Sequence, residues 1–202
     1  MEKSRIAVIG AGAIGGITAA LMAEKGYDVW LVCKHMEIAD LANGRGLHVR
    51  GYCGEHTVPV HSVAAVEELK DFFDLCMIAT KAYDMPECAK AMLPLLREDS
   101  LVVSMQNGIC TDALAAVVGK ERTVGCVIGW GATMLGPGEL AVTSKGEFLI
   151  GRLVKGEHPR MEALRQALSA VVETRVSQDI YAELYSKLIV NSCITSLGAI
   201  CG

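Results

Sequence analysis

Three glycines near the amino terminus have the spacing of a loop that binds a dinucleotide. Gly10, Gly12 and Gly15 form a G-x-G-x-x-G motif directly after the apolar run 6–9 and directly before a stretch of small, helix-forming residues. In such a motif the first glycine permits a tight turn, the second lets the backbone approach a pyrophosphate, and the third lets the helix pack against the strand. The phosphates then meet free N–H groups at the helix N-terminus. The predicted phosphate-binding residues are Gly10, Ala11, Gly12, Ala13, Ile14 and Gly15.

The residues after the second predicted strand indicate which dinucleotide would bind. Enzymes that use NAD usually carry an acidic residue there, which binds the ribose 2′-hydroxyl group. This chain has Cys33-Lys34-His35 at that point and no acid. A cation suits a 2′-phosphate, so Lys34 and the missing carboxylate predict NADP(H) as the cofactor.

Two polar residues follow later predicted strands in a similar way. Lys81 comes at the end of the apolar run 72–80, and Asn107 follows the run 101–105. Ligands of open α/β sheets bind beyond the carboxyl ends of the strands, near the point where the strand order reverses. Either residue alone would be typical of a surface charge or an Asn-Gly turn. Their shared position predicts that both lie at the cofactor site.

Lys187 and Asn191 form a further candidate pair near the end of the chain. Their i, i+4 spacing places both on one face of a predicted helix, where they can reach the same ligand. A lysine on a helix is ordinarily a solvated surface charge. Here the surrounding sequence, K-L-I-V-N-S-C, is apolar, which favours a functional role.

The spacing of apolar residues predicts the elements that position these side chains. Buried parallel strands are predicted at 6–9, 28–33, 72–80, 101–105 and within 123–133. Helices are predicted at 13–25, 36–43, 86–96, from 111 or 112 onward, 159–172 and 179–201. Strands that alternate with helices are typical of α/β proteins, and we predict a Rossmann-type, doubly wound, mostly parallel sheet.

Shorter strand-like segments predict additions to that sheet. They lie at 47–50, 55–60, 140–143, 147–150 and 174–177. The pair 140–143 and 147–150 is expected to form an antiparallel extension of the parallel sheet. The pair 47–50 and 55–60 alternates polar and apolar residues, as modest strands or a hairpin near the sheet edge do. A domain boundary is expected near residue 178.

Composition excludes several classes of function. Hydrophobic residues make up 51% of the 202 residues and the mean hydropathy is +0.35. No uninterrupted apolar run approaches the roughly 18 residues that indicate a membrane span, so we expect the apolar excess in the core or in an interface, with no membrane partner. A formal net charge of −4 with interspersed signs argues against a nucleic-acid surface.

Cysteine and histidine spacing predicts neither disulfides nor a metal site. There are eight cysteines but no C-x-x-C pair, which is typical of reduced thiols packed as small hydrophobic groups and predicts a cytoplasmic protein. The five histidines show no metal-ligand spacing.

The order of the motifs resembles that of the ketopantoate reductases, NADPH-dependent enzymes that make pantoate on the way to coenzyme A. The matching segments are I-A-V-I-G-A-G-A-I-G at the start, T-K-A-Y after the middle strand, Q-N-G after the next strand and K-L-I-V-N-S-C in the last helix. They span residues 6–193 and so cover nearly the whole chain. The first motif is generic to dinucleotide-binding folds, whereas the late Lys-x-x-x-Asn helix is more specific to this family.

The resemblance implies a role for each matching residue. Lys187 would be the proton donor and Asn191 would bind the substrate. Asn107 would bridge cofactor and substrate, Lys81 would lie beside the cofactor, and Lys34 would meet the 2′-phosphate. The implied reaction is hydride transfer from NADPH to the ketone of 2-dehydropantoate (ketopantoate), during which a protonated Lys187 would stabilise and then protonate the carbonyl oxygen.

One position departs from the family pattern. One turn after Asn191, where the family often has a second substrate-binding asparagine, this chain has Thr195. We expect Thr195 to contact the substrate, and the departure leaves the identity of the small-molecule 2-oxo acid open.

The resemblance also implies how the chain is divided. Residues 1–177 would form an NADP-binding, Rossmann-like domain, and 178–202 would begin an all-helical domain for substrate binding and dimerisation, the rest of which is absent. On this interpretation the chain is truncated and poorly active by itself. A homo-oligomer is expected through the last helix, because most packing partners of its apolar residues Leu184, Leu188, Ile194, Leu197 and Ile200 would lie in the absent part.

Two other functions fit the same residues. The chain could belong to another NADP(H)-dependent reductase that acts on a different 2-oxo acid or on an imine, which a panel of oxo acids would distinguish. Alternatively it could be a non-catalytic dinucleotide-binding module, which would bind cofactor without needing Lys187 or Asn191.

Overall fold

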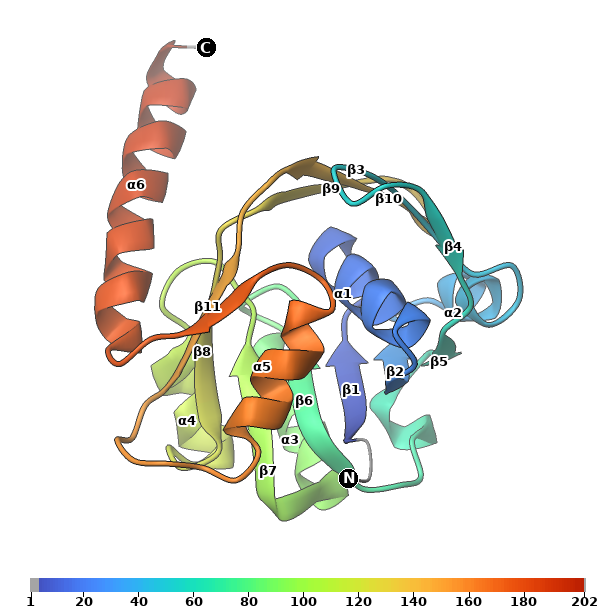
Figure 1. Cartoon of the computed structure of the whole chain (residues 1–202), viewed down its shortest axis with the longest axis horizontal. Coiled ribbons are helices and arrows are strands. Elements are labelled where there is room, and N and C mark those ends of the chain that lie inside the picture. Colours follow the sequence, from blue (N-terminus) through green and yellow to red (C-terminus); the bar gives the residue numbers. More distant parts are fainter. Residues whose placement is uncertain (1–3, 202) are drawn as a thin grey trace.

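An eight-stranded sheet runs through the centre of the molecule (Figure 1). A computed structural model describes residues 4–201, in which the strand order of this sheet is β12-β11-β8-β7-β6-β1-β2-β5. The strands are β1 (Arg5–Ile9), β2 (Asp28–Val32), β5 (His61–Val63), β6 (Phe73–Ile78), β7 (Leu96–Ser104), β8 (Thr123–Ile128), β11 (Phe148–Arg152) and β12 (Thr174–Val176). Neighbouring strands are parallel except β8 and β11, which are antiparallel. Since β2 lies on one side of β1 and β6 on the other, the strand order reverses at β1.

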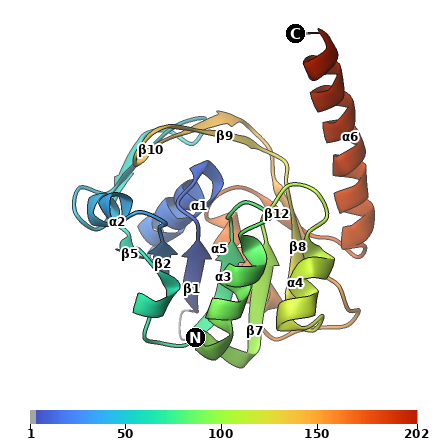
Figure 2. The ribbon, with the colours of Figure 1, turned by 180° about the vertical axis from the view of Figure 1, so that it is seen from behind.

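Helices cover both faces of this sheet. α1 (Ala13–Glu24) and α5 (Met161–Ser169) lie on one face, and α3 (Met85–Met92) and α4 (Thr111–Val118) lie on the other (Figures 1 and 2). α2 (Met36–Asn43) lies beside the edge strand β5. The predicted doubly wound, mostly parallel α/β sheet is therefore confirmed, including its antiparallel extension at β11.

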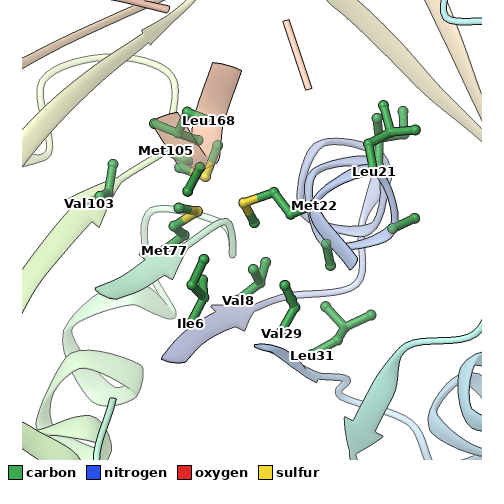
Figure 3. Close-up of a cluster of buried hydrophobic side chains, with 14 of the residues drawn as sticks. Ile6, Val8, Leu21, Met22, Val29, Leu31, Met77, Val103, Met105 and Leu168 are labelled. Carbon is green, nitrogen blue, oxygen red and sulfur yellow. The ribbon is translucent and has the colours of Figure 1, made fainter. Parts of the chain in front are cut away.

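The core between the sheet and α1 fixes where that helix begins. Figure 3 shows Val8 of β1, Leu31 of β2 and Met77 of β6 on the sheet side, with Met22 of α1 and Leu168 of α5 opposite them. All five side chains are fully buried. Burial of this kind contributes about 1.5–3 kcal/mol for each large apolar side chain. It holds the N-terminus of α1 at the carboxyl end of β1.

A second, four-stranded sheet covers the opposite side of α1 (Figure 1). Its order is β4-β3-β10-β9, with β3 (Leu47–Gly51), β4 (His56–Val58), β9 (Gly131–Gly136) and β10 (Glu139–Ser144). All residues of α1 from Gly15 to Met22 are buried. Because α1 lies between two sheets, its sequence is apolar on all sides.

The second sheet corrects two predictions. Residues 140–143 do not extend the parallel sheet, because β10 pairs with β3 and β9. Residues 47–50 and 55–60 do form an antiparallel pair, but away from the main sheet. The strand at the β2 edge of the main sheet is instead β5, which was not predicted. β3 and β10 are far apart in sequence, so their pairing leaves no local pattern by which it could be recognised.

Three histidine–carboxylate contacts, made by two histidines, stabilise this second sheet. His48 of β3 lies 2.6 Å from Glu139 of β10 through Nδ1 and 3.1 Å from Glu55 through Nε2. Hydrogen bonds with Glu139 and then Glu55 raise the pKa of His48 above its ordinary value. His56 of β4 lies 2.8 Å from Glu24 of α1, which ties the sheet to the helix beneath it.

The helix predicted at 86–96 is shorter than expected. α3 ends at Met92 and is followed by the 3₁₀ turn η2 (Leu93–Leu95). Pro94 has no N–H group and clashes with the preceding turn, so the α-helix cannot continue. β7 then begins at Leu96, five residues before the predicted start at Leu101. A second short 3₁₀ turn, η1 (Val66–Glu68), precedes β6.

α6 (Ile180–Cys201) begins on the main sheet and then projects away from it (Figures 1 and 2). Asp179 caps the helix as predicted, since its Oδ1 accepts a hydrogen bond from the Ala182 N–H at 3.1 Å. Ile180 and Leu184 are buried with Val127 of β8. Leu184 therefore packs within this chain, in contrast to the exposed apolar residues farther along α6.

Beyond its first turns α6 is apolar and exposed. Its large exposed side chains are Tyr185, Ile189, Val190, Ile194, Leu197 and Ile200. Among residues 4–201 it is the one helix whose length and composition would allow it to cross a membrane. Its most apolar stretch of 18 residues has a mean hydropathy of 1.3, and 6% of that stretch is buried. Core helices of soluble proteins pass the same test, but α6 is mostly exposed, so the absence of a membrane partner stays a prediction.

Candidate active site

The carboxyl ends of five neighbouring strands place the predicted site residues in one row. In the order β2, β1, β6 and β7, the strands are followed by Lys34, Gly10, Lys81 and Asn107. Lys187 of α6 reaches the end of the next strand, β8. Neighbouring strands lie about 4.8 Å apart, so the four intervals from β2 to β8 extend over about 19 Å. Residues that are distant in sequence thus share one edge of the sheet, at and beside the point where the strand order reverses.

The glycine loop has the geometry of a phosphate cradle. Gly10 has φ +110°, a conformation that L side chains rarely adopt. A Cβ on Gly15 would overlap the Gly10 carbonyl oxygen, so this close approach of helix and strand requires glycine. A Cβ on Gly12 would meet no atom within 4 Å, which leaves open space in front of the helix. Gly12 is the N-cap residue of α1, and as a glycine it has no side chain that could bond to the N–H groups of the helix. The N–H groups of its first turn therefore face that space and can bind an anion.

Lys34 and Lys81 are exposed on the same edge, on either side of the glycine loop in the order of the strands. Neither forms an ion pair with another residue of the described chain. Both ammonium groups are therefore available to an anionic ligand. Lys34 lies beyond β2, where a dinucleotide in a Rossmann fold places its adenosine ribose.

The other predicted residues line one open cavity of about 1030 Å³ between the sheet edge and α6. Asn107 contributes from the loop after β7, and Lys187, Asn191 and Thr195 contribute from three consecutive turns of α6. The glycine loop, Lys34 and Lys81 do not line this cavity and lie farther along the edge. The row therefore has a phosphate-binding part at β1 and β2 and a polar cavity at β7 and β8.

Lys187 is the half-buried cation of this cavity. Its Nζ donates a hydrogen bond of 2.7 Å to the carbonyl oxygen of Ile128, the last residue of β8. Burial lowers the pKa of the Lys187 ammonium group below its ordinary value, and nearby Cys126 opposes this effect. A lysine with a lowered pKa gives up its proton more readily at neutral pH.

Part of the cavity wall was not predicted from the sequence. Gly129, Trp130 and Gly131 connect β8 to β9 and line the cavity together with Ser144. The Gly129 N–H donates to the Glu147 carbonyl oxygen at 2.8 Å, and the Gly131 N–H donates to Ser144 Oγ at 2.8 Å. The G-W-G sequence between two strands could have indicated this wall, because glycines beside a strand often mark a place where a second backbone segment approaches closely.

Two buried cysteines near this row of residues are protonated thiols. All eight cysteines are unpaired in the structure. Burial raises the pKa of Cys33 and of Cys126 to about 12, so both are neutral thiols at pH 7. Within residues 4–201 no group of three or more His, Cys, Asp or Glu side chains could hold a metal ion.

One protein-family model covers most of this chain. The model of the family described as Ketopantoate reductase PanE/ApbA matches residues 6–155. A 2-dehydropantoate 2-reductase of Pyrococcus abyssi is 33% identical over 197 residues, which are 97% of this chain and 64% of the relative. A 2-dehydropantoate 2-reductase of Aquifex aeolicus is 27% identical over 96% of this chain and 62% of the relative. This chain thus spans less than two thirds of the length of these relatives.

Solved structures show the same fold. The crystal structure of 2-dehydropantoate 2-reductase from Geobacter metallireducens superposes with a TM-score of 0.84 at 29% identity, over 93% of this chain and 62% of that chain. A ternary structure of D-mandelate dehydrogenase with NADH and anilino(oxo)acetate gives a TM-score of 0.82 at 24% identity, over 93% of this chain and 61% of that chain. At that identity the second likeness concerns the fold alone.

Proposed function

Because the chain belongs to the ketopantoate reductase PanE/ApbA family, we propose that it serves the NADPH-dependent reduction of 2-dehydropantoate to pantoate, a step of pantothenate and coenzyme A biosynthesis in the cytoplasm. The observation that carries this proposal is the cavity beside the sheet edge, in which Lys187, Asn191 and Asn107 converge from two distant parts of the sequence. A half-buried lysine beside two amides matches the needs of a 2-oxo acid, which presents a ketone and a carboxylate.

The residues of the glycine loop fit the pyrophosphate of a dinucleotide. The open space in front of Gly12 and the uncapped first turn of α1 supply both the volume and the N–H donors that the pyrophosphate requires. Lys34 would hold the 2′-phosphate and Lys81 would lie beside the phosphates or the nicotinamide ribose. Asn107, at the start of the cavity, would contact both cofactor and substrate. When bound, NADPH supplies a hydride to the ketone carbon.

Lys187 would act on the ketone oxygen. Negative charge develops on that oxygen as the carbon is reduced, and an adjacent ammonium group stabilises it before donating a proton. Its hydrogen bond to Ile128 orients the amine toward the sheet edge. Asn191 lies one helical turn farther along α6 and would bind the substrate carboxylate or hydroxyl groups.

Thr195 supports a second candidate substrate class. The family often has asparagine at this position, and a threonine offers one hydroxyl group in place of an amide. A reductase of another 2-oxo acid would use the same cofactor loop and the same Lys187. Comparison of kcat/KM across a panel of 2-oxo acids, including ketopantoate, decides between the two.

The division of the chain is a proposal as well. Residues 1–177 would bind the cofactor, and α6 would begin a helical part that completes the substrate site or joins a second copy. The exposed apolar side chains of α6 support this, because several large apolar side chains exposed on one helix are typical of interfaces. Light scattering after size exclusion would detect the second copy directly.

The main test is an enzyme assay with protein produced from the coding sequence that contains these residues. We expect oxidation of NADPH that depends on ketopantoate, with NADH a poorer donor. Binding of NADPH to the 202-residue chain is measured separately by fluorescence. Binding without turnover of any 2-oxo acid would instead favour a non-catalytic dinucleotide-binding module.

A further inference from the structure

Gln106 is a buried polar residue at the carboxyl edge whose side chain is fully bonded. It is 7% exposed and follows β7 by two residues. Its Nε2 donates to the carbonyl oxygens of Ile78 at 2.7 Å and Thr80 at 3.2 Å. Its Oε1 accepts a hydrogen bond of 2.7 Å from the Oγ of Ser104, the last residue of β7, which is 3% exposed.

These bonds join the two segments that carry Lys81 and Asn107. The backbone ladder between β6 and β7 ends with the Met105 N–H donating to the Ile78 carbonyl at 3.0 Å. The Gln106 side chain continues the connection beyond that point, as far as Thr80. Thr80 directly precedes Lys81, and Gln106 directly precedes Asn107. One side chain therefore fixes the backbone immediately before both predicted ligand-binding residues.

The chemistry of the three partners allows only one orientation of the amide. The two carbonyl groups can only accept hydrogen bonds, so they require the NH₂ end of the side chain. Ser104 then donates its hydroxyl proton to the remaining oxygen. Neither a carboxylate nor an apolar side chain of similar length would satisfy the same carbonyl groups in this buried position.

We propose that Gln106 is a positioning residue, which sets the distance between the Lys81 and Asn107 loops and so preorganises the cofactor site. This inference rests on the proposed function for the identity of the ligand. These hydrogen bonds are made between residues of the chain itself. The contact of Gln106 with the end of β6, which we call the Gln106 clamp, can therefore be tested separately from the cofactor. A purely structural role would lower stability without a selective effect on these two loops.

The test compares Gln106→Met with a matched control in the same pair of strands. Methionine has a similar length but no donor. The control is Ser100→Ala, because Ser100 is fully buried in the middle of β7 and its Oγ donates at 2.7 Å to the carbonyl oxygen of Phe73, the first residue of β6 and the one farthest from the site. Both variants lose buried hydrogen bonds between the same strands, but only Gln106→Met loses them beside the site. Ser104→Ala is a milder second variant, which removes only the orienting hydroxyl group.

Two measurements on the 202-residue chain decide the outcome. In Gln106→Met we expect NADPH to bind about tenfold more weakly and backbone amides of 79–84 and 106–110 to exchange hydrogen faster. Ser104→Ala should change both in the same direction by less, and Ser100→Ala should change neither. The proposal is overturned if the backbone amides of these two loops exchange no faster in Gln106→Met than in Ser100→Ala. If Gln106→Met does not fold, Ser104→Ala takes its place in this comparison. If the parent chain binds no dinucleotide, the proposed function fails. Hydrogen exchange measured without added cofactor still shows whether Gln106 fixes the two loops.

Discussion

The Nζ atom of Lys187 lies 2.7 Å from the carbonyl oxygen of Ile128, which connects the first half of α6 to the last residue of β8. The two residues are distant in sequence, and the bond directs the amine to the edge where the cofactor row ends. An ammonium group has three donors, so this contact leaves two for a substrate oxygen.

Replacement of Lys187 by methionine should abolish proton donation while keeping most of the side-chain volume. We expect turnover of ketopantoate to fall by about 10²–10⁴ with NADPH affinity nearly unchanged, because the glycine loop is untouched. Steady-state assays and NADPH titration measure the two quantities. Lys90→Met, at an exposed position on α3, is the matched control. Turnover close to the parental value would show that Lys187 is not the proton donor.

The pH dependence of turnover should report the lowered pKa of Lys187. The reaction needs the protonated amine, so activity is lost as the pH rises through that pKa. Since burial lowers it, the alkaline limb of kcat/KM should lie below the ordinary lysine value of about 10.4. Measurement of kcat/KM from neutral to alkaline pH tests this. An alkaline limb at or above the ordinary value contradicts the prediction.

Lys34 should determine the preference for NADPH over NADH. A charge-assisted hydrogen bond to phosphate contributes about 1.5–3 kcal/mol, so Lys34→Ala should weaken NADPH binding roughly tenfold or more and leave NADH binding unchanged. Fluorescence titrations with both cofactors measure this. Lys25→Ala, at the other end of α1, is the control. Equal affinities for the two cofactors in the parent chain would remove the basis for assigning Lys34 to the 2′-phosphate.

Alanine substitutions at two glycines of the same loop should impair different properties, stability at Gly15 and NADPH binding at Gly12. At Gly15 the new methyl group overlaps the Gly10 carbonyl oxygen, so Gly15→Ala should lower the free energy of unfolding by about 1–3 kcal/mol or more. At Gly12 the methyl group enters open space, and the backbone has φ −72° and ψ −175°, which alanine adopts freely. Gly12→Ala should therefore keep its Tm and lose NADPH affinity. Unimpaired NADPH binding by folded Gly12→Ala would place the pyrophosphate elsewhere.

His48 should make stability depend on pH in a defined direction. Its hydrogen bonds with Glu139 and Glu55 raise its pKa in the folded chain, so the protonated form stabilises the fold. This contribution is fully present below the unfolded value of about 6.5 and is lost as the pH rises through the folded pKa. The Tm of His48→Gln should thus fall below that of the parent most at about pH 5.5 and converge with it at alkaline pH. His35→Gln, at the exposed N-terminus of α2, is the control; a Tm difference that is constant with pH would argue against the effect.

Local sequence spacing was sufficient for the elements and for part of the site. The apolar run before Gly10 and the glycine spacing after it predicted β1, the loop and α1, because each depends on a few consecutive residues. Helix α2 was predicted with its observed bounds, Met36–Asn43. The i, i+4 spacing of Lys187 and Asn191 predicted one shared face, since helical periodicity fixes it.

The tertiary structure determined which distant residues these local segments contact. Strand order places Lys34, Gly10, Lys81 and Asn107 in a single row, and that order follows from non-local strand pairing. Non-local packing likewise produces the second sheet over α1, the Ile128 carbonyl partner of Lys187 and the bonds of Gln106 to the end of β6. The physical reason is the same in each case. Periodicity records how a segment contacts its immediate neighbours and which face is buried, whereas a backbone carbonyl or an edge strand becomes a partner only when the chain packs around a shared core.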